Sequence, residues 1–157
     1  MKKIYKIFIV ALLLFGVLRT YLYKNNAAAG TRVVFSYGQD GDSCVVKEVD
    51  EEYTIRMIGI NAPEKGEAYG DDAKKFVNNK MKNAKEIILE SDPNADFEDK
   101  YGRHLVWVFV DGELLQKEIV EKGLARVAYL YDDYLYTDEL FKAEDYAKAN
   151  KLGIWNE

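Results

Sequence analysis

Hydrophobic residues after the first 30 positions occur in short runs that polar turns separate, a pattern that predicts strands. The predicted strands cover 31–36, 44–49, 53–60, 86–90 and 104–110. The run 53–60 is apolar on both of its alternating faces, which indicates an interior strand. Only short turns join the first three strands, so we expect them to pair antiparallel.

Three further segments carry apolar residues at helical spacing, namely 71–81, 113–122 and 137–151, and 124–131 is expected to be extended. Residues that commonly begin or end helices bound these segments: Asp71 or Asp72, Gly123, Thr137 and Gly153. Five short strands, interrupted by one helix and followed by two more, predict an α+β fold. We expect a five-stranded β-barrel of the oligonucleotide/oligosaccharide-binding type with three helices.

The N-terminal segment has a different pattern. Three lysines precede an unbroken apolar run, 7–18, which Arg19 ends. This predicts a hydrophobic helix within residues 1–29 that is either a signal peptide or an N-terminal membrane anchor, followed by one domain over 30–157. The run is shorter than the roughly 20 residues of a full membrane span. We expect a protein that is secreted or anchored to the outer face of the cell membrane; the alternative is a buried helix of the domain.

Charge and composition restrict the chemistry. Five of the 22 bases and none of the 27 acids fall within 1–29, so the remainder carries 17 bases and 27 acids, a net charge of −10. This argues against a broad basic face that grips nucleic acid. The single cysteine, Cys44, excludes an internal disulfide and is expected to be a buried thiol. The single histidine, His104, excludes a mechanism that needs two, and there is no Cys/His cluster for zinc.

The segment 56–64 combines an arginine, an apolar run and a carboxylate after a proline. A guanidinium in an interior strand is costly to bury unless it meets an anion, which makes Arg56 a candidate for phosphate binding. Gly59 indicates a bulge or a close backbone approach, and Pro63 ends the strand and holds Glu64 in a turn. The alternative is a structural salt bridge at the end of a strand.

Three other segments could contribute to a site. Asp40-Gly41-Asp42-Ser43 offers clustered carboxylates for a hard cation, or is a plain turn. Asp99-Lys100-Tyr101-Gly102-Arg103 offers an arginine fork for phosphate, or is a solvated loop. Tyr129 and Tyr131 lie on one face of an extended segment, where they could stack on bases or form a half-buried aromatic pair.

The order and separation of these motifs resemble the staphylococcal nuclease (thermonuclease) family over nearly all of residues 31–157. The matching motifs are Asp40 to Ser43, Arg56 to Glu64, Asp99 to Arg103, Gly123 to Tyr131 and Lys151 to Trp155. The resemblance implies the same barrel with three helices.

The resemblance also implies a calcium site. The family's first calcium carboxylate falls on Asp42, with Asp40 beside it and outside direct contact with the metal. The second falls on Asn61, which departs from the family pattern because asparagine brings no charge and should lower calcium affinity. The backbone carbonyl ligand falls on Ala62.

The remaining roles that the resemblance implies belong to the reaction and the substrate. The general base falls on Glu64, and the two phosphate-binding arginines fall on Arg56 and Arg103. The nucleotide contacts fall on four residues: Lys100, Tyr101, Tyr129 and Tyr131.

Together these roles imply a monomeric calcium-dependent endonuclease that hydrolyses DNA and RNA, with single strands favoured, to leave 3′-phosphate ends. Calcium would offset the charge of the scissile phosphate, Glu64 would orient the attacking water, and the arginines would stabilise the transition state. Two other classes stay open. One is a catalytically weakened module that binds nucleic acid or protein and is tethered to the membrane. The other is a membrane-tethered structural protein.

Overall fold

The computed structural model describes residues 30–156. The predicted signal peptide or membrane anchor at 1–29 lies outside the described residues, as does Glu157. Within the described range, no helix combines the length and apolar character needed to cross a membrane.

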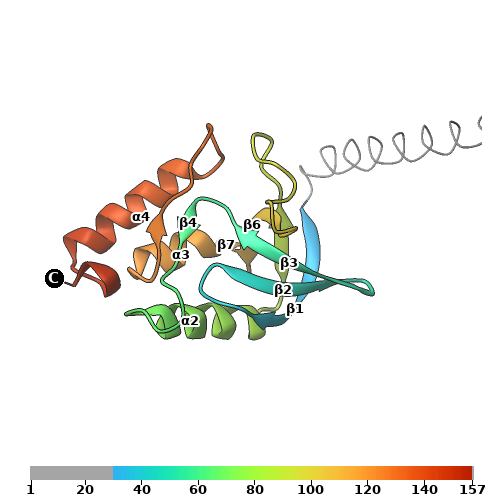
Figure 1. The fold of residues 1–157 in the computed structure, drawn as a ribbon, viewed down its shortest axis with the longest axis horizontal. Coiled ribbons are helices and arrows are strands. Elements are labelled where there is room, and N and C mark those ends of the chain that lie inside the picture. Colours follow the sequence, from blue (N-terminus) through green and yellow to red (C-terminus); the bar gives the residue numbers. More distant parts are fainter. Residues whose placement is uncertain (1–29, 157) are drawn as a thin grey trace, which may run out of the picture.

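Three strands, β1 (Thr31–Gly38), β2 (Ser43–Glu48) and β3 (Glu51–Met57), form an antiparallel meander, as predicted. β5 (Ile87–Glu90) pairs with β1, and β6 (His104–Val110) pairs with β5. β6 also pairs in parallel with β3, which closes the barrel seen in Figure 1. The α+β fold with a five-stranded barrel and three helices is therefore confirmed.

The prediction of one continuous strand over 53–60 was wrong. β3 ends at Met57, and β4 (Ile60–Asn61) begins after a turn at Ile58 and Gly59. Gly59 has φ +77, a backbone conformation that favours glycine, and a Cβ atom there would lie 2.8 Å from Leu140 Cδ1, so any other residue at this turn would be strained. The close approach to this glycine is made by side chains, those of Leu140, Trp107 and Leu130.

A second, two-stranded sheet follows from this break. β4 pairs antiparallel with β8 (Arg126–Val127), which is all of the predicted extended segment 124–131 that forms a strand. This pairing attaches the segment that carries the tyrosines to the exit of β3.

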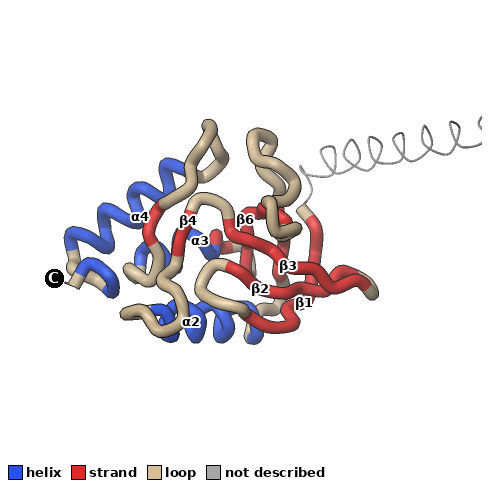
Figure 2. The backbone as a smooth tube through the Cα atoms, in the orientation of Figure 1, coloured by secondary structure: helices blue, strands red, loops and turns tan. Residues whose placement is uncertain are grey.

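The helices are α2 (Gly70–Lys82), α3 (Leu115–Glu121) and α4 (Thr137–Ala149), and a 3-10 turn, η1 (Gly153–Trp155), follows. Figure 1 shows α2 running along the barrel and α3 and α4 gathered at the end away from the β2–β3 hairpin; Figure 2 shows the same division between strands and helices. The helix predicted to begin at 113 begins at 115, because β7 (Glu113–Leu114) pairs with β6.

The predicted caps are partly wrong. Tyr69 and Tyr136 precede α2 and α4, each in the left-handed backbone region and without a side-chain capping bond. Asp71 and Asp72 lie within the first turn of α2, where their negative charges interact favourably with the helix dipole and stabilise the helix. Thr137 is the first residue of α4, so it does not cap the helix.

The C-terminal ends also differ in detail. Gly123, with φ +67, follows α3 and confirms the predicted glycine end. α4 ends at Ala149, ahead of the predicted 151, and Gly153 opens η1 instead of ending the helix.

The core fills the barrel and the interface with the helices, and Trp107, Ile55 and Met57 are among its fully buried side chains. Cys44 is fully buried, as predicted, and burial raises the pKa of its thiol to about 12. Gln116 is also fully buried. Its amide accepts a bond from the Val108 N–H and donates one to the Val106 carbonyl, so α3 is tied to β6 by polar contacts inside the core.

Candidate active site

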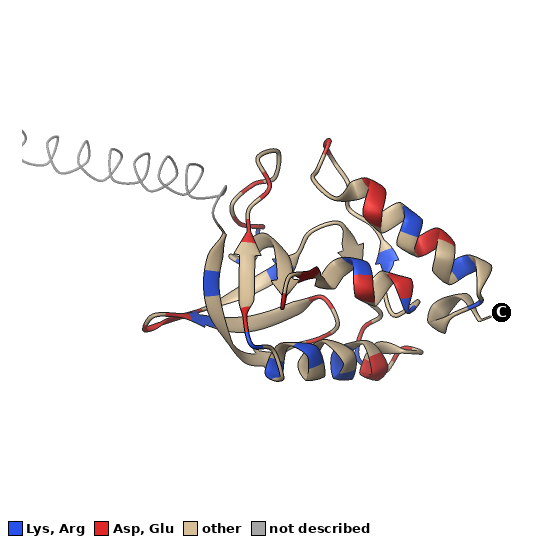
Figure 3. Ribbon diagram, turned by 180° about the vertical axis from the view of Figure 1, so that it is seen from behind, with Lys and Arg blue, Asp and Glu red and all other residues tan. Residues whose placement is uncertain are grey.

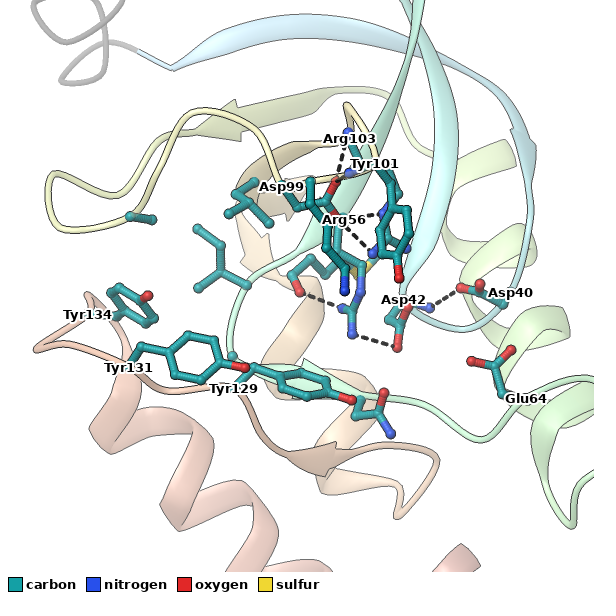
Figure 4. A pocket seen from close by; sticks show the side chains of 17 residues that line it. Asp40, Asp42, Arg56, Glu64, Asp99, Tyr101, Arg103, Tyr129, Tyr131 and Tyr134 are labelled. Atoms are coloured by element: carbon teal, nitrogen blue, oxygen red, sulfur yellow. Dashed lines mark hydrogen bonds and ion pairs between the residues drawn. The ribbon is translucent and has the colours of Figure 1, made fainter.

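A pocket of about 720 Å3 opens on the wall of the barrel (Figure 4). Its lining comes from the turn after β1, the end of β3, the exit of β4, the loop before β6 and the segment after β8. Ten of the eleven predicted site residues line this one pocket: Asp40, Asp42, Arg56, Asn61, Glu64, Lys100, Tyr101, Arg103, Tyr129 and Tyr131.

Arg56 lies at the end of β3 and is held from three directions. Its Nη1 donates to the Met57 carbonyl at 2.7 Å, and its Nη2 donates to the Ile60 carbonyl at 2.9 Å. The same Nη2 lies 3.2 Å from Oδ2 of Asp42, and both side chains are buried. The turn at Gly59 brings the Ile60 carbonyl back towards the guanidinium. The salt bridge considered as an alternative at 56–64 therefore exists, and it forms part of the pocket wall.

Asp42 is the buried carboxylate of the site. Its Oδ2 accepts a bond from the Ala62 N–H at 2.8 Å, and its Oδ1 accepts one from the Ser43 hydroxyl at 3.0 Å. Burial raises the pKa of Asp42 to about 6, although Arg56 acts in the opposite direction. Asp40 lies beside it and uses Oδ1 to accept bonds from the N–H groups of Asp42 and Ser43. Asp40 thus shapes the turn that presents Asp42.

Arg103 is positioned by Asp99. Its Nε donates to Asp99 Oδ2 at 2.7 Å, and its Nη1 donates to the Ser43 hydroxyl at 3.2 Å. Burial raises the pKa of Asp99, but hydrogen bonds from Arg103 and Tyr101 outweigh that effect and leave the pKa below its ordinary value. The guanidinium also lies 5.4 Å from the ring centroid of Tyr101. The guanidinium planes of Arg56 and Arg103 are thus both held before any ligand binds.

Glu64 lies at the edge of the pocket and is exposed. Its backbone N–H donates to Glu67 Oε2 at 2.8 Å, which fixes the turn after Pro63. Among residues 30–156, no hydrogen bond or ion pair engages its carboxylate. A carboxylate in this state can accept a hydrogen bond from a water molecule.

Asn61 ends β4, and Ala62 follows it directly. Asn61 is half-buried, lines the pocket and lies opposite Arg126 in the β4–β8 pair. Ala62 is buried and is the one predicted site residue absent from the pocket lining. Its N–H contacts Asp42, and the metal contact expected of its carbonyl stays a prediction.

Aromatic side chains lie along the pocket. Tyr129 and Tyr131 are exposed, their ring centroids are 6.4 Å apart, and Tyr129 lies 5.8 Å from the Arg56 guanidinium. Tyr101 is exposed near the opposite wall, with Lys100 Nζ 5.0 Å from its ring centroid. In Figure 4, Tyr131 and Glu64 lie at opposite ends of the site, with Asp42 between them. The alternative of a half-buried tyrosine pair is wrong, because both rings are open to solvent.

The donor set suits a hard cation. The pocket offers carboxylate oxygens from Asp40, Asp42 and Glu64 and an amide oxygen from Asn61, with neither histidine nor cysteine in its lining. In the described part of the chain, no three His, Cys, Asp or Glu side chains lie close enough together to form a metal cluster. Carboxylate and amide oxygens are the ligands that a hard cation such as calcium prefers, so the residue types present fit such an ion.

Sequence reasoning missed the supporting roles of three residues: Ser43, Asp99 and Tyr134. Ser43 bridges Asp42 and Arg103 through its hydroxyl, and Asp99 fixes the Arg103 guanidinium. Tyr134 adds a further aromatic side chain to the pocket lining. The spacing of four residues between Asp99 and Arg103 was a usable signal in the sequence. The sequence carried no signal for the bridge by Ser43, because that bridge depends on the pairing of β2, β3 and β6.

Comparison with known proteins decides the family. A family model described as staphylococcal nuclease homologue matches residues 54–157. The chain belongs to the staphylococcal nuclease family. The predicted family is thereby confirmed, and the barrel with three helices is the fold that the family resemblance implied.

Several curated relatives of this family member are nucleases by name. Over 124 residues, the chain is 40% identical to the SPbeta prophage-derived endonuclease YokF of Bacillus subtilis (strain 168), covering 74% of this chain and 41% of that protein. It is 38% identical over 141 residues to Endonuclease YncB of the same strain, covering 85% of this chain and 66% of that protein. Thermonuclease of Staphylococcus hyicus is 30% identical over 123 residues, covering 74% and 71% of the two chains. The chain therefore spans less than two thirds of the first two relatives.

Proposed function

We propose that this protein is a calcium-dependent endonuclease that hydrolyses phosphodiester bonds of DNA and RNA and leaves 3′-phosphate ends. The observation that carries the proposal is that Arg56, Arg103 and Glu64 line one pocket beside a set of oxygen donors. The names of the relatives, endonuclease and thermonuclease, support the same reaction class.

The two arginines bind the scissile phosphate and stabilise the charge that develops on its oxygens. Arg56 is fixed by two carbonyls and Asp42, and Arg103 is fixed by Asp99, so neither guanidinium has to be ordered when substrate arrives. Fixed, forked donors match the geometry of phosphate oxygens better than a mobile cation does. The pair therefore supplies a preorganised anion site.

Glu64 orients the attacking water and accepts its proton. Its carboxylate is exposed at the pocket edge and has no partner among the described residues, so water can reach it. The Glu67 contact with its backbone holds the turn that carries it. A glutamine at this position would keep the shape and lose the ability to accept a proton.

Calcium would be held by Asp42, Asn61 and the Ala62 carbonyl, with Asp40 supporting Asp42 from behind. When bound, the ion supplies positive charge that polarises the scissile phosphate. The buried Asp42 carboxylate, whose pKa is raised by burial, is a group whose ionised form a cation would stabilise. The neutral Asn61 implies that more calcium is needed than a second carboxylate ligand at this position would require.

The substrate is a nucleic acid, with single strands favoured, because exposed Tyr101, Tyr129 and Tyr131 offer faces on which unpaired bases can stack. Lys100 adds a cation beside Tyr101, where its Nζ lies 5.0 Å from the ring centroid. Acidic and basic positions are interspersed along α4 (Figure 3), so this helix has no continuous basic face to bind nucleic acid. This fits binding that is local to the arginine-lined pocket. We propose a monomer that is exported through residues 1–29 and is either secreted or tethered to the outer face of the cell membrane.

Digestion of labelled single-stranded DNA and RNA, with calcium and with a chelator, tests this function. We expect cleavage only with calcium, a 3′-phosphate on the product, and loss of about 100-fold or more in rate for Glu64→Gln. Glu113→Gln is the matched control, because Glu113 is exposed on β7 and does not line the pocket. Cleavage that persists in chelator, or in Glu64→Gln, would contradict the mechanism.

A further inference from the structure

A second pocket lies near the first, because its lining includes Pro63, which precedes Glu64 of the first pocket. It has a volume of about 410 Å3 and lies between the turn after β4, the start of α2 and the C-terminal η1. We call it the distal pocket, and its lining includes Pro63, Glu67, Tyr69, Arg126, Ile154 and Asn156. Pro63 precedes Glu64 directly, so the chain segment that ends the first pocket begins the second.

The pairing of β4 with β8 places the two pockets on one surface. Asn61, in the first pocket, lies directly opposite Arg126, in the distal pocket, in an antiparallel pair. Residues directly opposite each other in such a pair carry their side chains on the same face. Arg126 therefore lies next to Asn61 on the same face of the β4–β8 pair.

Arg126 is available to bind an anion. It is exposed and is the only base among the residues that line the distal pocket. Within residues 30–156, no ion pair or hydrogen bond occupies its side chain. The one acid in the lining, Glu67, accepts a bond from the Glu64 N–H at 2.8 Å, so its carboxylate is engaged at the border between the pockets.

Tyr69 provides an aromatic wall. It is half-buried, precedes α2 and has φ +66, a conformation that a non-glycine residue rarely adopts. An aromatic ring beside an exposed arginine combines the two elements that bind a nucleotide of a single strand, namely a surface for the base and a cation for the phosphate. The Asn156 amide adds a donor and an acceptor at the rim.

We propose that the distal pocket binds the nucleotide on the other side of the scissile phosphodiester from Tyr129 and Tyr131. Arg126 binds the phosphate of that nucleotide and Tyr69 stacks on its base. The inference rests on the proposed nuclease function and deepens it, because it makes the site a cleft with a subsite on each side of the cleaved bond. Such a site prefers an internal bond of a polynucleotide to a bond with a nucleoside on one side only.

The test compares two substrates. One is a single-stranded oligodeoxynucleotide of about ten residues, and the other is a nucleoside 5′-(4-nitrophenyl phosphate), which carries a nucleoside on one side only. For Arg126→Gln, we expect KM for the oligonucleotide to rise about fivefold and KM for the nitrophenyl ester to stay unchanged. The salt dependence of oligonucleotide binding should also weaken. In a plot of the logarithm of the binding constant against the logarithm of the salt concentration, the slope should become shallower by about 0.7.

Three further variants complete the design. Tyr69→Asn keeps a residue that tolerates the left-handed backbone and removes the ring, so it should also weaken oligonucleotide binding alone, and Tyr69→Phe should restore it. Arg32→Gln is the matched control, since Arg32 pairs with Glu86 on the exposed side of β1 and lines neither pocket. Circular dichroism checks that each variant is folded.

The outcomes separate the two claims. If the wild type cleaves both substrates and Arg126→Gln affects both equally or neither, the subsite is wrong and the nuclease function stands. If the wild type cleaves neither substrate with calcium present, the nuclease function is wrong and the subsite is wrong with it.

Discussion

The Arg56 guanidinium and the Asp42 carboxylate lie 3.2 Å apart in the wall of the pocket, and both are buried. One comes from β3 and the other from the turn before β2, and the register Ser43↔Arg56 brings them together. The pair couples the proposed phosphate site to the proposed calcium site, since the same carboxylate orients the arginine and is offered to the metal.

Replacing Arg56 with lysine should lower kcat by about 100-fold. Lysine offers a point charge on a flexible stem, so it cannot bond the Met57 and Ile60 carbonyls at once and still present a fork to phosphate. Steady-state kinetics on single-stranded DNA measures the loss, with Arg32→Lys as the control. A kcat within threefold of the wild type would show that the fork is dispensable.

Replacing Asn61 with aspartate should reduce the calcium concentration needed for half-maximal rate by about tenfold, because a second carboxylate ligand beside Asp42 strengthens binding of a hard cation. In chelator, the same variant should be less stable than the wild type, since its new charge lies near Asp42 without a metal to offset it. A calcium titration of the rate and a thermal melt measure the two effects. The hypothesis fails if the variant gains nothing at low calcium.

Replacing the buried Asp92 with asparagine should lower the free energy of unfolding by about 2 kcal/mol. Its Oδ2 accepts bonds from Trp107 Nε1 at 2.8 Å and from the Leu135 N–H at 2.7 Å, and its Oδ1 accepts a bond from the Asn94 N–H at 2.9 Å. Asparagine would place an NH2 group, which cannot accept, at one of these two positions. Asp96→Asn, exposed on the same loop, is the control.

Urea unfolding measures the difference between these variants. Because Asp92 ties the loop that follows β5 to the segment that carries the pocket tyrosines, KM for DNA should rise as well. Equal stability of both variants would show that the hydrogen bonds at Asp92 contribute little.

Stability should fall in alkaline solution through Tyr136. Burial, followed by the bond from its hydroxyl to Glu90, raises the pKa of Tyr136 to about 12, above its ordinary value of 10.0. Since the folded state holds this proton more tightly than the unfolded state, the contribution of Tyr136 to the free energy of unfolding is complete below pH 10. It is lost as pH rises towards 12. The free energy of unfolding at several pH values, compared with Tyr136→Phe, isolates the effect. Parallel curves for the two proteins would exclude it.

Much of the site was predictable because its parts are local. Asp40 and Asp42 share a turn, Arg103 follows Asp99 by four residues, and Glu64 follows a proline that ends a strand. Each motif is ambiguous alone, and their order along the chain indicated the family. The roles assigned to these residues stay predictions, because proximity in a pocket shows what the residues can do and leaves the reaction to be measured.

The sequence by itself indicated the family, the order and approximate positions of five strands and three helices, and ten of the residues that line the pocket, because hydrophobic periodicity, turn residues and motif order are properties of neighbouring positions. Only the tertiary structure decided that the chain breaks at Gly59, that Ser43 bridges Asp42 and Arg103, and that Asn61 lies opposite Arg126. Those contacts depend on strand register and on closure of the barrel between β3 and β6. They join residues that are far apart in the chain, and no local sequence pattern shows that these residues lie close together in the folded protein.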